Sequence, residues 1–176
     1  MNDTQATLNV INQMQADGVI GKYAIGGAIA AAFYIEPSAT YDIDIFIPFD
    51  NAPGSSLASL GHIYDYLFHR GYKAAGAHVI IEGWQVQFLP ADDALYKEAL
   101  EHAIGVNVGT IKTWVMTAEH LMTIALRTGR GKDFIRIEQF VRHDAFDESN
   151  LVQILNRYNL FNRWEQFNEK YIKEAK

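Results

Sequence analysis

The segment that most constrains the fold of this chain runs from residue 22 to residue 48 and reads KYAIGGAIAAAFYIEPSATYDIDIFIP. Its apolar runs are interrupted by a glycine pair, a proline and a polar stretch, which are typical of changes in secondary structure. The pattern predicts a short strand, a glycine turn, a helix of small residues, a polar loop and a second strand. These elements cover residues 23–25, 26–27, 27–35, 38–41 and 42–48.

Two acidic residues, Asp42 and Asp44, lie on the second of these strands and are called the Asp pair below. Side chains alternate along a strand, so the two carboxylates face the same way and Ile43, Ile45 and Ile47 face the other way, into a core. Neighbouring carboxylates repel each other unless a cation lies between them, and Mg²⁺ is the usual cation for oxygen ligands. The pair therefore predicts a metal site; the alternative is a strand end that meets solvent.

The glycine turn, Gly26 and Gly27, precedes a helix and exposes backbone N–H groups, which suit a phosphate. A phosphate site beside paired carboxylates predicts metal-assisted nucleotide chemistry. Two other protein classes with an Asp-x-Asp sequence fit less well. A haloacid-dehalogenase phosphatase places its nucleophilic aspartate directly after an apolar strand, whereas Asp42 follows a loop. A glycosyltransferase has a larger nucleotide-sugar domain before the motif.

The rest of the sequence predicts an α+β fold, because strands mixed with helices come first and helices alone come last. Capping residues and helical periodicity predict helices before residue 18 and at 60–70, 92–103, 118–128, 133–141, 148–158 and 160–175. Strands are expected at 72–73, 78–81 and 84–89, where Pro90 ends the run, and as two short pieces within 105–115. We expect an α/β core over residues 1–115 and a helical C-terminal lobe, residues 116–176, packed on it.

The sequence GGAIAAAFYIEPSATYDIDIFI resembles the polymerase-β-type nucleotidyltransferase superfamily, in which a Gly-Gly turn, a small-residue helix, a polar loop and an Asp-x-Asp strand follow in this order. Within it the segment is similar to the AbiEii-type toxin nucleotidyltransferases and their bacterial relatives. A later stretch, TAEHLMTIALRTGRGKDFIRI, resembles the helical segment of those proteins. The likeness covers about residues 23–137. It implies a nucleotidyltransferase-like mixed sheet flanked by helices, with toxin–antitoxin membership as a further hypothesis.

The resemblance also implies roles for particular residues. The Asp pair would hold Mg²⁺ while NMP is moved from an NTP to an acceptor hydroxyl with loss of pyrophosphate. The nucleotide would be bound around the glycine turn and the polar loop, by Gly26, Gly27, Ala28 and Ser38. Lys132 would reach the phosphates or the acceptor, and Asp133 would orient it. An exposed lysine at a helix start is the alternative for Lys132.

Two positions depart from the pattern of the resembled proteins. Ala28 stands where these proteins often have Ser or Thr, and Gln87 stands where a third carboxylate usually lies on a later strand. A glutamine can offer a carbonyl oxygen to a metal, but it cannot act as a base. Three interpretations stay open. The enzyme works without a third acid, or Glu82 or Asp92 takes the place of that acid. In the third, the chain is a catalytically inactive nucleotide-binding or interaction module.

Composition limits the partners. The net charge of −6 excludes a general nucleic-acid coat, although Arg127, Arg130 and Lys132 could form a local site for RNA. The acceptor stays open between RNA, a protein and a small molecule. The absence of cysteine excludes thiolate catalysis, and the six histidines show no metal-binding spacing. A polar N-terminus and the lack of an apolar run of roughly 20 residues predict a cytoplasmic protein with no membrane partner. An antitoxin or a second copy is left open as a protein partner.

Overall fold

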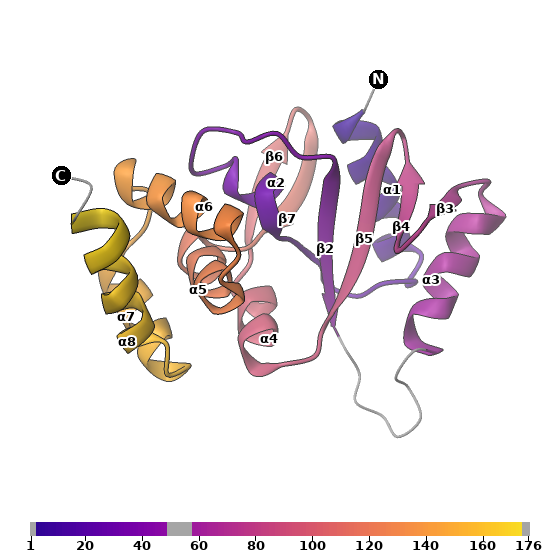
Figure 1. Cartoon of the computed structure of the whole chain (residues 1–176). Helices are drawn as coiled ribbons and strands as arrows, with labels where there is room; N and C mark the ends of the chain where they lie inside the picture. The colour runs from indigo at the N-terminus through magenta and orange to yellow at the C-terminus, as the bar shows by residue number, and fades with distance from the viewer. Residues whose placement is uncertain (1–2, 49–57, 174–176) are drawn as a thin grey trace.

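A computed structural model of the chain describes residues 3–48 and 58–173. Within these residues, seven strands form one mixed sheet in the order β3-β4-β5-β2-β1-β7-β6, and eight α-helices surround it (Figure 1). The predicted α+β class, with a mixed sheet flanked by helices, is confirmed. The strands are β1 (Ala24–Ile25), β2 (Asp42–Pro48), β3 (Lys73–Ala75), β4 (His78–Ile81), β5 (Trp84–Ala91), β6 (Ile104–Val108) and β7 (Ile111–Val115).

The β2 strand lies in the middle of the sheet and carries the Asp pair. It runs antiparallel to β1 and parallel to β5, with Asp42 opposite Gln85 and Asp44 opposite Gln87. The three isoleucines of β2 are buried on the opposite face, as predicted. This arrangement follows from the alternating sequence, because a central strand needs one face that is apolar throughout.

The helices begin at the capping residues that the sequence marks. The side chains of Asp3, Asp93 and Thr117 accept hydrogen bonds from first-turn amides of α1, α4 and α5. The helices are α1 (Thr4–Ala16), α2 (Gly27–Ala31), α3 (Ala58–His69), α4 (Ala94–Glu101), α5 (Ala118–Thr128), α6 (Gly131–Arg142), α7 (Glu148–Arg157) and α8 (Phe161–Phe167). A π-helical turn, Asn168–Lys173, follows α8 where a continuous helix was predicted.

Two predicted boundaries were wrong. The helix predicted over residues 27–35 ends at Ala31, because the backbone tightens into turns in which Phe33 and Tyr34 bond to carbonyls three residues back. The Tyr34 hydroxyl also donates to the carbonyl oxygen of Met116. Pro90 does not end β5 but pairs with Ile47 of β2. The β4 strand pairs only with residues 84–86 of β5, so Pro90 lies on an unpaired edge where its missing N–H costs no ladder hydrogen bond.

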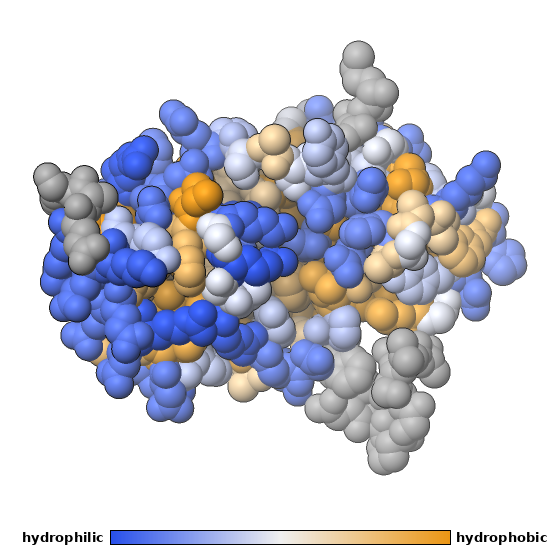
Figure 2. Space-filling model, viewed as in Figure 1, coloured by the Kyte–Doolittle hydropathy of each residue, from blue (hydrophilic) through white to orange (hydrophobic). Residues whose placement is uncertain are grey.

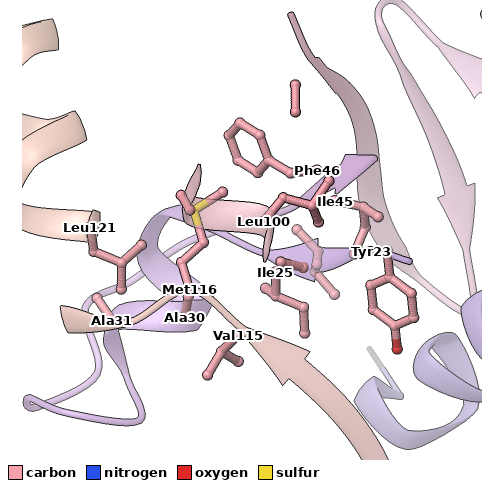
Figure 3. Close-up of a cluster of buried hydrophobic side chains, with 14 of the residues drawn as sticks. Tyr23, Ile25, Ala30, Ala31, Ile45, Phe46, Leu100, Val115, Met116 and Leu121 are labelled. Atoms are coloured by element: carbon pink, nitrogen blue, oxygen red, sulfur yellow. The ribbon is translucent and has the colours of Figure 1, made fainter. Parts of the chain in front are cut away.

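One hydrophobic core joins the sheet to the helices. Figure 3 shows part of it, in which Ile25 and Val115 from the sheet lie near Met116, with Tyr23 at one end of the cluster and Leu121 of the helical region at the other. In Figure 1, helices α5 to α8 gather on one side of the strands, and α1 and α3 lie on the other. The division into a core of residues 1–115 and a lobe of residues 116–176 stays a prediction. The last strand ends at Val115, and the described chain after it is helical.

Candidate functional site

The glycine turn lies directly against the Asp pair. The Gly26 backbone amide donates to the carbonyl oxygen of Asp44 at 2.9 Å, so this amide is used inside the protein. Gly27 has a left-handed φ of +59°, which favours glycine. A Cβ atom on Gly27 would overlap Oδ2 of Asp44 and lie 3.3 Å from its Cγ. Two features therefore require glycine at position 27: the left-handed backbone conformation and the close approach of the Asp44 carboxylate.

A pocket of about 290 Å³ opens in front of the Asp pair and is called the Asp pocket below. Its floor comes from β2, its neighbour β5 and the start of α2, and its wall comes from the polar loop and α6. In Figure 2, strongly hydrophilic residues gather between α6 and β2 on this face. Its lining residues are Gly27, Ala28, Ser38, Ala39, Thr40, Asp42, Asp44, Gln87, Arg130, Lys132, Ile135, Arg136 and Gln139.

The electrostatics of the Asp pocket are set by two carboxylates and three cations. Burial raises the pKa of Asp44, and the neighbouring charge of Asp42 raises it further. Lys132, Arg136 and Arg130 oppose this shift, in that order of strength. The Thr40 hydroxyl donates to Oδ1 of Asp42 at 2.6 Å and so fixes the orientation of the first carboxylate. The pKa of Asp44 remains raised despite the three cations, so a further positive charge beside this carboxylate would be favourable.

Gln87 lies beside Asp44 on the adjoining strand. Parallel pairing of β2 and β5 puts the two residues opposite each other, and both line the Asp pocket. The proposed substitutes for a third acid lie elsewhere. Glu82 lies in the turn between β4 and β5, Asp92 follows β5, and neither lines the Asp pocket. Glu82 also accepts a hydrogen bond from the Tyr72 hydroxyl at 2.8 Å. The structure therefore leaves an amide in the third position.

Asp133 is the one predicted site residue, apart from Gly26, that does not line the Asp pocket. Its buried carboxylate accepts from the backbone amide of Arg130 at 3.2 Å and from the Arg130 Nε at 2.7 Å, and it lies 3.6 Å from Arg136 Nη1. Asp133 thus caps α6 and holds two cations of the pocket wall. Sequence reasoning missed Arg136 and Thr40. The signal for Arg136 was its spacing of four residues from Lys132, which puts both on one helix face.

A second pocket of about 280 Å³ adjoins the Asp pocket and is called the apolar pocket below. The two pockets share Gly27, Asp44, Gln87, Arg130 and Arg136. The apolar pocket adds a mostly apolar lining from β2, β5, α4 and α5: Phe46, Leu89, Tyr96, Met116, Leu121, Ile124 and Ala125, together with Thr128 and Asp133. Asp44 consequently borders both pockets, and the second pocket has apolar side chains on one part of its lining and charged groups on the other.

Comparison with solved structures gives the fold a name. The crystal structure of an antigenic nucleotidyltransferase-like protein from Paracoccidioides brasiliensis superposes with a TM-score of 0.55, at 15% sequence identity, over 81% of this chain and 77% of that one. The chain has a nucleotidyltransferase-like fold. The solution structure of the antibiotic-resistance factor ANT(2'')-Ia aligns with a TM-score of 0.47 and 17% identity over 99% of this chain and 97% of that one.

The sequence matches no protein-family model, and a search of curated proteins finds no match. Among residues 3–48 and 58–173, no helix is long and apolar enough to cross a membrane.

Proposed function

We propose that the protein is a Mg²⁺-dependent nucleotidyltransferase that moves NMP from an NTP to an acceptor hydroxyl. The observation that carries the proposal is the Asp pocket, in which the Asp pair of β2 faces the cations of α6 across a space of about 290 Å³. A triphosphate needs cations around its oxygens, and the metal that accompanies it needs carboxylates. The Asp pocket offers both kinds of group on facing walls.

The donor set of the Asp pocket fits Mg²⁺. Asp42, Asp44 and the carbonyl oxygen of Gln87 are hard oxygen ligands on two adjoining strands. The raised pKa of Asp44 is relieved by a bound cation, because a positive charge favours the ionised form. A bound Mg²⁺ would supply charge neutralisation at the phosphates.

The residues of the chain have separate tasks in this proposal. Lys132 and Arg136 lie one helical turn apart on α6 and would bind the phosphate oxygens, and Arg130 would join them from the start of that helix. The amides of Gly27 and Ala28 begin a helix and lack acceptors four residues back, so they can donate to a phosphate. The Gly26 amide is not part of this proposed phosphate site, because it already donates to the backbone carbonyl oxygen of Asp44.

The apolar pocket would take the second substrate or the nucleotide base. Its apolar lining includes the rings of Phe46 and Tyr96, whose centroids are 5.2 Å apart. Flat apolar groups pack well against such rings. Asp44 borders both pockets, so it can lie between a triphosphate in the Asp pocket and a group bound in the apolar one. The acceptor stays open between RNA, a protein and a small molecule.

Transfer can be tested with labelled NTPs, Mg²⁺ and pooled cellular RNA, protein and small-molecule fractions. We expect wild type to label one fraction and to release pyrophosphate, and Asp44→Asn to do neither. Asp65→Asn is a matched control, because Asp65 is an exposed aspartate on α3, outside the lining of both pockets. Equal labelling by wild type and Asp44→Asn would reject the assignment of Asp44.

A second candidate function, a catalytically inactive nucleotide-binding module, is favoured by the amide at Gln87. On this reading, an NTP with Mg²⁺ raises the Tm but no pyrophosphate appears. Gln87→Glu separates the two functions, because it restores a carboxylate next to Asp44. Pyrophosphate release gained only in Gln87→Glu would support the inactive module. Release by wild type would exclude it.

The narrower features of the proposal rest on the resemblance in the sequence. They are closeness to the AbiEii-type toxins, membership of a toxin–antitoxin pair, a cytoplasmic location and an antitoxin or a second copy as partner. Growth arrest on overexpression of wild type but not of Asp42→Ala would support the toxin hypothesis. Growth of both strains at the rate of an empty-vector control would refute it.

A further inference from the structure

A second group of metal-binding side chains lies outside the Asp pocket and the apolar pocket. Glu98 is on α4, His102 directly follows that helix, and His120 is in the first turn of α5. One ligand atom of each lies within 4.8 Å of the others. They line a pocket of about 300 Å³ whose lining shares no residue with the two pockets described above. No local pattern in the sequence indicates this group, because 17 residues, including β6 and β7, lie between the two histidines.

The hydrogen bonds of His102 leave one ring nitrogen available. Its Nδ1 lies 2.9 Å from the backbone carbonyl oxygen of Glu98. A carbonyl oxygen only accepts, so Nδ1 carries the hydrogen and the neutral ring has its lone pair on Nε2. A backbone carbonyl that orients a histidine in this way is a common partner of metal-ligating histidines.

His120 is oriented in a similar way but is buried. Its Nδ1 lies 2.8 Å from the Thr117 hydroxyl, and its Nε2 lies 3.3 Å from Oε1 of Glu98. In a tetrahedral zinc site with bonds of about 2.0–2.1 Å, two ligand atoms are separated by roughly 3.4 Å. His120 and Glu98 already have this separation. The ligand atom of His102 lies within 4.8 Å of these two atoms, so the exposed ring completes the site by a shift of about 1 Å.

We propose that Glu98, His102 and His120 bind a divalent transition-metal ion, with Zn²⁺ as the best-suited metal and water as the fourth ligand. Two imidazoles and one carboxylate are a zinc-type ligand set, whereas Mg²⁺ prefers oxygen ligands alone. The ion ties the end of α4 to the start of α5, two helices that line the apolar pocket. The site is independent of the proposed transferase function.

Arg157 competes with the metal for Glu98. Its guanidinium forms an ion pair with Oε1, the carboxylate oxygen that faces His120, while the Tyr158 hydroxyl donates to Oε2 at 2.6 Å. Arg157 is half exposed and comes from α7, so it can turn toward solvent when the metal binds. Removal of this positive charge should therefore tighten metal binding.

The test uses the full-length protein with Zn²⁺ alone in a thermal unfolding assay, and with Co²⁺ alone in a visible absorption assay. At a free Zn²⁺ concentration a hundred times the Kd, we expect a rise in Tm of roughly 5–10 °C. Co²⁺ should give the intense d–d absorption of a tetrahedral site. Both signals should be lost in His102→Ala, which changes an exposed side chain and should leave the fold intact.

His69→Ala is the matched control. His69 lies at the C-terminal end of α3, is exposed, and bonds through Nδ1 to the carbonyl oxygen of Asp65 four residues back, as His102 does to Glu98. This variant and Asp44→Asn should keep the Zn²⁺ response, and Arg157→Gln should lower the Kd about tenfold. No Zn²⁺ response in wild type, or the same response in wild type and His102→Ala, would overturn the proposal.

Discussion

Replacement of Gly27 by alanine tests the contact on which the Asp pocket depends. The substitution adds one methyl group at a residue with a φ of +59°, at a point where Oδ2 of Asp44 already occupies the space. Two costs follow. An L side chain is strained in the left-handed region, and the carboxylate has to leave its present position. The first cost affects stability, and the second affects the site.

The two effects differ in size. A left-handed non-glycine residue costs about 1–2 kcal/mol, and for a chain of this length that lowers the Tm by about 2–8 °C. To regain ordinary van der Waals contact with the new Cβ, the Asp44 oxygen has to move by about 1 Å. A misplacement of that size at a catalytic group lowers a rate about 100-fold. We therefore expect a folded, moderately destabilised protein whose pyrophosphate release falls about 100-fold.

Gly18→Ala is the control that separates strain from displacement. Gly18 has a similar φ of +72°, but a Cβ there meets no atom within 4 Å. Thermal unfolding should show a comparable loss of Tm in both variants, while pyrophosphate release should fall only in Gly27→Ala. If Gly27→Ala and Gly18→Ala release pyrophosphate at the same rate, the reaction does not depend on the present position of the Asp44 carboxylate and the reasoning is wrong.

Three other substitutions give expected outcomes at different parts of the Asp pocket. Asp44→Asn should stabilise the protein at neutral pH in the absence of metal, because the raised pKa of Asp44 means that its ionised form costs folding free energy. This gain should shrink as pH falls through the raised pKa of Asp44 and vanish below the ordinary aspartate value of 3.8, where Asp44 is protonated in both the folded and the unfolded chain. A pH series of unfolding midpoints checks this. Asp133→Asn should lower the free energy of unfolding by about 3 kcal/mol in a urea titration, since it leaves the partly buried Arg136 without its ion pair; a loss below about 1 kcal/mol would contradict this. Lys132→Ala should raise the KM for NTP about tenfold with little change in Tm, because Lys132 is exposed at the pocket rim; an unchanged KM would leave Lys132 as a surface residue only.

Local sequence patterns predicted most of the fold. The alternation of β2, the caps at Asp3, Asp93 and Thr117, and the glycine turn all act within a few residues, so they can be read from the chain directly. The errors came where a distant partner decided the outcome. The helix after Gly27 ends before Tyr34, whose hydroxyl donates to the distant carbonyl oxygen of Met116. The β5 strand passes through Pro90 because β4 pairs only with residues 84–86.

The candidate site divides in the same way. The sequence alone determined that Asp42 and Asp44 share one face of a buried strand and that a flexible glycine turn precedes them, because both follow from chain geometry. Only the tertiary structure decided that Gln87 stands opposite Asp44, that α6 brings Arg136 and Lys132 to the facing wall, and that His102 meets His120. These meetings depend on strand register and helix packing between residues far apart in sequence. Register and packing are determined by the burial of apolar side chains from many segments at once, so no single segment of the sequence predicts them.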